Sequence, residues 1–136
     1  MDQKTILNHI EDLIFKDEAT KDFEFFNGKL SVSIASLNGG NQLEIERRMR
    51  DVTGTNAEIL HYYQLWILTY TVRLYNGQKP ENIETWFDFI KNKPTIILDV
   101  LIKTQGDFEK ELREGLNNKE VIENFSNPTS TAPESV

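Results

Sequence analysis

Hydrophobic residues recur every three or four positions over residues 4–16 of this chain, and this spacing predicts an amphipathic helix. The apolar positions form one stripe along that helix: Ile6, Leu7, Ile10, Leu13 and Ile14. A charged run from Asp17 to Asp22 then interrupts the pattern. We therefore expect a first helix that ends near Lys16.

A β-hairpin is expected next, over residues 22–35. Asn27-Gly28 separates two short runs in which apolar and polar residues alternate. This dipeptide favours a two-residue type I′ turn, because both positions tolerate positive φ. The turn sets the register, and the facing pairs on the apolar side are Phe25 with Leu30 and Phe23 with Val32. Since a lone hairpin is marginal in water, it must pack on helices or pair with a partner's strand.

Two capping patterns place helices after the hairpin. Residues 41–44 (Asn-Gln-Leu-Glu) have capping-box spacing with Asn41 as the N-cap, and Gly54 is a suitable stop. Residues 55–58 (Thr-Asn-Ala-Glu) repeat the box and open a long helix that we expect to run through Tyr75. Because this helix is apolar on nearly all sides, it should lie at the centre of the fold.

Proline marks the start of the last two predicted helices. Pro80 suits the first position of a short helix, and Pro94 suits the start of a helix that continues to about Glu114. The pattern as a whole predicts a mainly α (α+β) fold, in which about five helices pack with one N-terminal β-hairpin.

One globular domain is expected over residues 1–116, with the helical bundle at residues 41–116. The composition changes over residues 117–136, where Asn, Ser, Thr, Pro and Glu dominate. The apolar residues that could anchor this stretch are few: Val121, Ile122 and Phe125. Since it cannot bury enough surface to offset the entropy of ordering, we expect a flexible polar tail.

Composition narrows the function classes. The 136 residues carry 15 Lys and Arg against 22 Asp and Glu, a net charge of −7, which argues against nucleic-acid binding by bulk electrostatics. The absence of Cys removes disulfide scaffolds, thiolate zinc sites and Cys nucleophiles, and it is compatible with a cytoplasmic protein. The uncharged stretch 59–72 reaches roughly 21 Å as a helix, short of the ~30 Å membrane core, so no membrane span is expected.

The candidate catalytic residues are few. His9 and His61 are the two histidines, and neither has a second ligand or a nucleophile at a motif spacing. No zinc-protease, phosphate-loop, nucleophile-elbow or dinucleotide-binding motif occurs. We therefore expect a protein that is not an enzyme and that has no catalytic residues, metal or cofactor.

Two clusters are candidate partner-binding residues. Arg47, Arg48 and Arg50 form the basic cluster of the chain, which could grip an acidic partner, although Glu44, Glu46 and Asp51 could equally balance it on a solvated helix face. The second cluster is aromatic: Trp86, Phe87 and Phe89. These rings suit a core, but they give a short helix more apolar surface than one face needs, so part of it could meet a partner.

The order of these features resembles the tail assembly chaperones of long-tailed bacteriophages. The similarity covers roughly residues 22–116 and consists of patterns of apolar positions. Its parts are the hairpin at residues 26–32, the charged helix at 44–51, the hydrophobic helix ending at 74–77, the segment with Trp86 and Phe87, and the helix that begins at 92–94 and passes through 97–108.

The resemblance implies assembly without catalysis. Such chaperones are made in the cytoplasm of the infected host, bind the long helical tape measure protein, keep it soluble, recruit tail tube subunits and leave before the virion is complete. The expected partners are thus other proteins, with neither nucleic acid nor membrane. Copies of the chain could also pair through the edges of the hairpin, as a homo-oligomer.

Two other functions stay open at this point. The chain could be a structural component that remains in the virion, such as a baseplate, hub or tail-completion adaptor. It could also be a small cytosolic regulator that binds one protein through its acidic surface. Partner identity and oligomeric state do not follow from the sequence.

Overall fold

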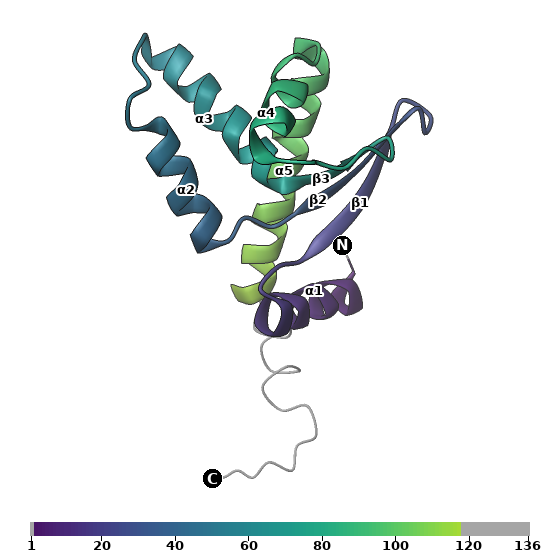
Figure 1. Cartoon of the computed structure of the whole chain (residues 1–136). Helices are drawn as coiled ribbons and strands as arrows, with labels where there is room; N and C mark the ends of the chain where they lie inside the picture. Colours follow the sequence, from purple (N-terminus) through teal and green to yellow (C-terminus); the bar gives the residue numbers. More distant parts are fainter. Residues whose placement is uncertain (1, 118–136) are drawn as a thin grey trace.

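The computed structural model describes residues 2–117, which form five helices and a three-stranded antiparallel sheet (Figure 1). The sheet order is β1-β2-β3, with β1 at Thr20–Phe25, β2 at Leu30–Ala35 and β3 at Val72–Tyr75. The helices are α1 (Gln3–Lys16), α2 (Gly39–Met49), α3 (Asn56–Thr71), α4 (Ile83–Lys91) and α5 (Thr95–Asn117). The mainly α fold with a small sheet is the class that the pattern predicts.

The hairpin has the predicted register. Phe25 faces Leu30, and Phe23 faces Val32, as the position of Asn27-Gly28 requires. The turn is longer than the predicted two residues, because strand pairing stops at Phe25 and Phe26 also has a positive φ of 56°.

The third strand corrects the prediction that the long helix runs through Tyr75. Helix α3 ends at Thr71, and the chain from Val72 pairs with β2. Asn76 fixes the end of this pairing: its N–H donates to the Ser31 carbonyl at 2.7 Å, and its Oδ1 accepts from the Ser31 N–H at 2.7 Å. Pairing with β2 satisfies backbone groups that a two-stranded hairpin would leave open.

The helix starts are partly as predicted. Thr55 and Glu58 form the expected capping box at the start of α3. The N-cap of α2 is Asn38, whose Oδ1 accepts from the Asn41 N–H, so the prediction of Asn41 is wrong. Helix α4 begins at Ile83 with Asn82 as its N-cap, so the prediction that Pro80 takes its first position is wrong. In both cases the Asx side chain closest to the first helical turn satisfies the free N–H groups.

The core lies between the sheet and the C-terminal half of α3, α4 and α5. Its fully buried side chains include Val32, Ile34, Leu65, Leu68, Ile90, Leu101 and Phe108. The Phe108 ring of α5 meets the edge of Phe23 of β1 at a centroid distance of 6.1 Å. The prediction that α3 is central holds for this half of the helix, whereas Leu60 and Tyr62 in its first half are 56% and 41% exposed.

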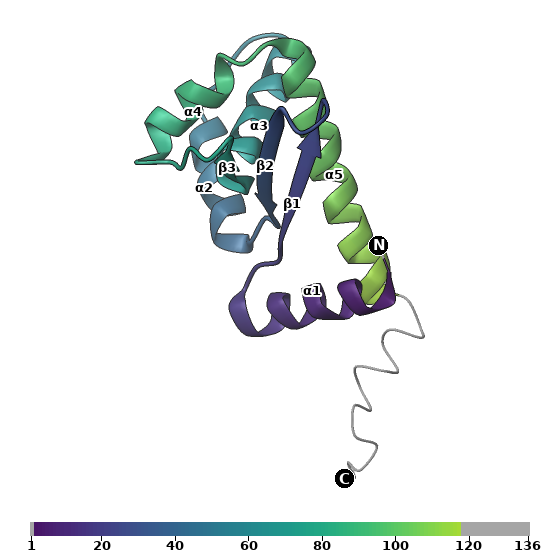
Figure 2. The same ribbon diagram turned by 90° about the vertical axis from the view of Figure 1, so that its right-hand side faces the viewer.

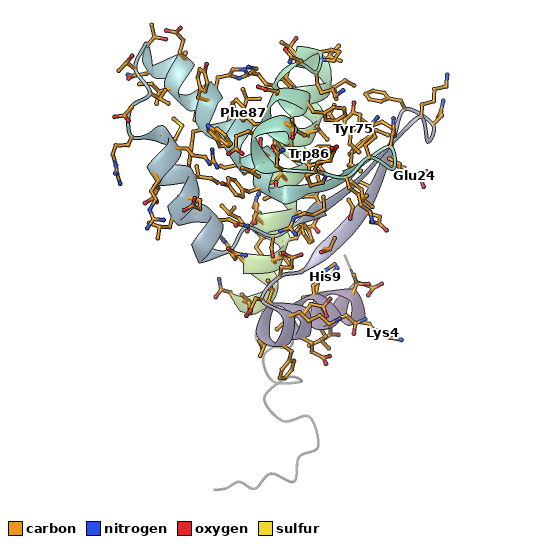
Figure 3. All side chains as sticks on the ribbon, viewed as in Figure 1. Lys4, His9, Glu24, Tyr75, Trp86 and Phe87 are labelled. Carbon is orange, nitrogen blue, oxygen red and sulfur yellow. The ribbon has the colours of Figure 1, made fainter. Side chains whose placement is uncertain are left out.

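Helix α1 crosses below the sheet and packs on the end of α5 (Figure 2). Gly115 allows the close approach, because a Cβ at that position would lie 2.5 Å from Cγ2 of Ile6. His9 is buried at the same junction, with its ring edge-on to Phe108 at 5.5 Å (Figure 3).

The predicted domain of residues 1–116 and the predicted tail of residues 117–136 remain predictions. Residues 118–136 lie outside the described residues, and α5 continues to Asn117. Within residues 2–117, no helix has the length and apolar character that a membrane crossing requires.

Candidate functional site

A groove of about 460 Å³ lies between α2 and α3, and we call it the α2–α3 groove. In Figure 1 these helices form a pair in which the start of α3 points away from α5. The groove is lined by Gln42, Glu46, Met49 and Arg50 of α2 and its end, and by Asn56, Ile59, Leu60 and Tyr63 of α3. Apolar side chains from both helices thus form one concave surface.

Local sequence sets the two walls of this groove. Asn38 starts α2, the Thr55 capping box starts α3, and the short loop between them returns the chain. Gly54 has a φ of 138°, which other residues rarely adopt, so it permits this tight return. The walls meet at a hydrogen bond of 2.9 Å from the Gln42 amide to the Tyr63 hydroxyl.

Three large apolar side chains of α2 and α3 are exposed. Leu60 is 56% exposed, Leu43 of α2 is 49% exposed, and Tyr62 is 41% exposed. Large apolar side chains exposed next to an apolar groove lower the free energy when a partner covers them. Of these three residues Leu60 lines the groove itself, and Leu43 and Tyr62 add exposed apolar surface to the same two helices.

A second hollow of about 450 Å³ adjoins the groove on the other side of the Gln42–Tyr63 hydrogen bond. Its lining is more polar: Leu37, Asn38, Gly39, Gln42, Tyr63, Ile67, Gln105, Glu109 and Arg113. The Glu109 carboxylate is already occupied, since it accepts from the Leu37 N–H at 2.6 Å and from the Gln105 amide at 3.4 Å. This carboxylate ties α5 to the segment before α2.

The predicted basic cluster is divided by the structure. Arg47 is ion-paired with Glu44 at 2.8 Å on the exposed face of α2. Arg50 lines the α2–α3 groove and has no ion pair within residues 2–117. The three arginines therefore do not form one basic surface.

Arg48 contacts side chains of two other helices. Its guanidinium lies 4.6 Å from the ring centroid of Trp66, donates to the Tyr70 hydroxyl at 3.0 Å and pairs with Glu84 at 2.8 Å. Burial alone would lower the pKa of Arg48, but the hydrogen bonds with Glu84 and Tyr70 outweigh it and raise the pKa above its ordinary value. Arg48 thereby links α2 to α3 and α4.

Trp86 and Phe87 are 3% and 8% exposed, so of the two open interpretations of the aromatic cluster the core one holds for these two rings. The Trp86 Nε1 donates to the Val72 carbonyl at 2.9 Å, and Phe87 stacks on Trp66 at 3.9 Å. Phe89 is half-buried between Trp86 and Tyr75, with the Lys93 amine 3.6 Å from its ring centroid. The surplus apolar surface of α4 is taken up by α3 on one side and by β3 on the other (Figure 3).

The two histidines differ in burial. His61 is exposed on α3, whereas His9 is buried between α1, β1 and α5. Burial, with a smaller effect from Lys21, lowers the pKa of His9 below its ordinary value of 6.5. Within residues 2–117, no three His, Cys, Asp or Glu side chains gather as a metal site would require.

Of the residues that line the α2–α3 groove, Arg50 was predicted as a partner-binding residue, whereas the apolar lining of Met49, Ile59 and Leu60 was not. A signal was present, because α3 is apolar on nearly all sides and a helix of that kind needs cover all round. The sequence does not show which side the rest of the chain leaves uncovered. Comparisons of the chain with protein-family models, with curated proteins and with solved structures found no match.

Proposed function

We propose that this protein is a non-catalytic assembly chaperone that receives an amphipathic helix of a partner protein in the α2–α3 groove. The observation that carries the proposal is the apolar lining of that groove, formed by Met49, Ile59 and Leu60, next to the exposed side chain of Leu43. A helix laid against two helices buries its apolar stripe at positions i, i+3, i+4 and i+7. The groove offers this arrangement.

The polar rim suits a helix that must also be released. Glu46 and Arg50 line the groove with opposite charges, and Gln42 and Asn56 add amide groups. Polar flanks of a bound helix would find partners there, while the apolar contact remains small enough to separate. Reversible binding is what a chaperone needs.

The resemblance to phage tail assembly chaperones supplies the partner. A tape measure protein is a long helix whose apolar stripes would aggregate if they stayed exposed. Copies of a chain with a net charge of −7 along those stripes would keep the helix soluble by mutual repulsion and by hydration. Tail tube subunits would be recruited to this complex in the cytoplasm of the infected host.

Fluorescence anisotropy with a labelled 18-residue amphipathic peptide tests the groove. We expect binding of this peptide, and no binding of a scrambled peptide of equal composition. Leu60→Asp should weaken binding at least about tenfold, because it places a carboxylate in the apolar contact. Ile96→Asp is the matched control, since Ile96 is 70% exposed on α5 and does not line the groove. An equal loss of affinity in both variants would show that the peptide does not bind in the groove.

Purified virions distinguish the chaperone from its main alternative. Quantitative mass spectrometry should recover tail proteins without this chain, since a chaperone leaves before the particle is complete. Recovery of this chain in stoichiometric amounts would instead assign it to the baseplate, the hub or a tail-completion adaptor. A pull-down that yields a single host protein, with neither tape measure nor tube protein, would indicate a regulator.

A further inference from the structure

We propose that the outer edge of β1 is a second binding site, which adds an extended basic segment of a partner protein to the sheet as a fourth strand. This site is separate from the α2–α3 groove and does not depend on it. β1 ends the sheet on one side, because the strand order is β1-β2-β3. Figure 2 looks onto this edge, and none of the helices in residues 2–117 lies across it.

The hydrogen bonds of β2 show which backbone groups of β1 are open. Both the N–H and the carbonyl of Ser31 bond to Asn76, on the β3 side. Ser31 faces Glu24 in the register, so this pair does not exchange backbone bonds. Bonded and non-bonded pairs alternate along antiparallel strands, so the backbone groups of Asp22 and Glu24 also point away from β2.

The open part of the edge has a defined start. Thr20 has the same orientation by alternation, but its backbone is hydrogen-bonded to His9 of α1. The free stretch is therefore Lys21 to Phe25, with Asp22 and Glu24 supplying two N–H donors and two carbonyl acceptors. A fourth strand would satisfy all four groups.

The side chains of that stretch define the chemistry of the added strand. Asp22 and Glu24 are exposed on one face, and the sheet places only Ser33 and Ser31 opposite them. Neither carboxylate has an ion pair within residues 2–117. Figure 3 shows Glu24 at the outer margin of the sheet. Lys or Arg at alternate positions of an incoming strand would lie directly across from these carboxylates.

The opposite face of β1 favours apolar side chains at the positions of the incoming strand that alternate with its Lys or Arg residues. Phe23 and Phe25 are half-buried on that face, with their rings stacked at a centroid distance of 6.3 Å. An incoming strand places every second side chain beside them, since side chains alternate between faces. The favoured segment therefore alternates Lys or Arg with Val, Ile or another apolar residue.

A second copy of this chain is a poor occupant of the edge. Two β1 strands related by a two-fold axis would be antiparallel, with facing residues on the same side of the sheet. Centred on Asp22, that pairing opposes Asp22 to itself; centred on Phe23, it opposes Asp22 to Glu24 twice. Like charges directly across from each other destabilise strand pairs, so the edge rejects itself and favours a basic partner.

A blocked peptide with the sequence Thr-Val-Arg-Val-Lys-Val-Thr is the probe for this site. Titration monitored by amide hydrogen exchange should slow exchange at Asp22 and Glu24, because the added strand bonds their N–H groups. The same peptide with Glu in place of Arg and Lys should bind at least about tenfold more weakly. Failure of the basic peptide to bind, equal binding of the two peptides, or binding without protection at residues 22 and 24 would overturn the proposal.

Three variants locate the site. Asp22→Lys combined with Glu24→Lys should reverse the preference toward the acidic peptide. Glu24→Pro should abolish binding of both peptides while the fold is kept, because the N–H that it removes points outward. Asp99→Lys with Glu114→Lys is the control, since both residues are exposed on α5 and the net charge changes equally. Loss of peptide binding in the control, or retained peptide binding in Glu24→Pro, would contradict the site. Leu60→Asp in the α2–α3 groove should leave binding of the basic peptide unchanged.

Discussion

At the scale of residues, the best-defined interactions join elements that are distant in the sequence. The Arg48 guanidinium of α2 contacts Trp66 and Tyr70 of α3 and Glu84 of α4. The Trp66 ring lies between this guanidinium and Phe87, at 4.6 Å and 3.9 Å. A buried aromatic ring with contacts on both faces contributes through area and through ring electrostatics. Two buried ring side chains, Trp66 and His9, give direct tests.

Trp66→Ala should lower the free energy of unfolding by about 3–5 kcal/mol, because it leaves a cavity between Arg48 and Phe87. Urea denaturation monitored by far-UV circular dichroism measures this loss. Leu60→Ala on the same helix is the control, with an expected loss below about 1 kcal/mol since Leu60 is 56% exposed. A loss below about 1 kcal/mol for Trp66→Ala would place this ring outside the core.

His9 should make stability depend on pH. Burial lowers its pKa below 6.5, Lys21 adds to this, and Asp12 and Glu111 act in the opposite direction. The unfolded chain therefore binds more protons just below pH 6.5 than the folded one, and stability decreases as the pH falls through that range.

Unfolding of the wild type and of His9→Gln, from about pH 8 to about pH 5, measures this effect in the window where histidine titrates. The wild type should lose stability relative to the variant as the pH falls. Parallel curves would show that His9 does not titrate differently in the two states.

At the scale of elements, α1 packs mainly on one other helix, and its position depends on a small residue. Within residues 2–117, α1 packs mainly on α5, where Gly115 allows the close approach of Ile6. Its last turn leaves Phe15 76% exposed and Ile14 50% exposed. The rest of the fold is tied by the sheet and by the aromatic contacts of α4.

Gly115→Ala should destabilise the protein by about 1–3 kcal/mol through overpacking against Ile6, less the gain of up to ~1 kcal/mol in helix propensity. Gly106→Ala on the same helix is the matched control, because its Cβ would meet nothing within 4 Å. That control should gain up to ~1 kcal/mol. Thermal unfolding of both variants measures the difference, and a gain for Gly115→Ala would show that α1 does not pack as described.

The elements also show what sequence can predict. The hairpin register follows from Asn27-Gly28 and from local alternation, so it could be predicted. Strand β3 could not, because Val72–Tyr75 continues the apolar run of α3 and becomes a strand only through pairing with β2. The start of α2 is predicted three residues late, since Asn38 and Asn41 both have a suitable capping side chain, and the start of α4 is predicted three residues early, at Pro80 instead of Ile83.

At the scale of the whole molecule, the predicted site and the structural one differ. The sequence indicated Trp86 and Phe87 as surplus apolar surface, but α3 and β3 cover them. It indicated that α3 lies at the centre of the fold, yet the first half of α3 faces the groove with Leu60 exposed. Which apolar face stays uncovered depends on how distant elements pack, and the periodicity of one helix does not contain that information.

The acidic charge is compatible with both proposed surfaces. In the two proposals, the α2–α3 groove would bind a partner through apolar side chains, and the edge of β1 would bind one through Asp22 and Glu24. An acidic protein with these two surfaces could hold a helix and a strand at once, while its net charge of −7 keeps the complex soluble. This combination is what we expect of a protein that joins other proteins during assembly.

Site-specific photo-crosslinking tests the central claim most directly. A photoreactive phenylalanine analogue replaces Leu60 in the groove or, in a matched sample, Ile96 on α5, and each variant is co-expressed with the tape measure protein. The account predicts a crosslink from position 60, mapped to an apolar position of a helical segment, and none from position 96. A crosslink from position 96 alone, or equal yields from both positions, would contradict it.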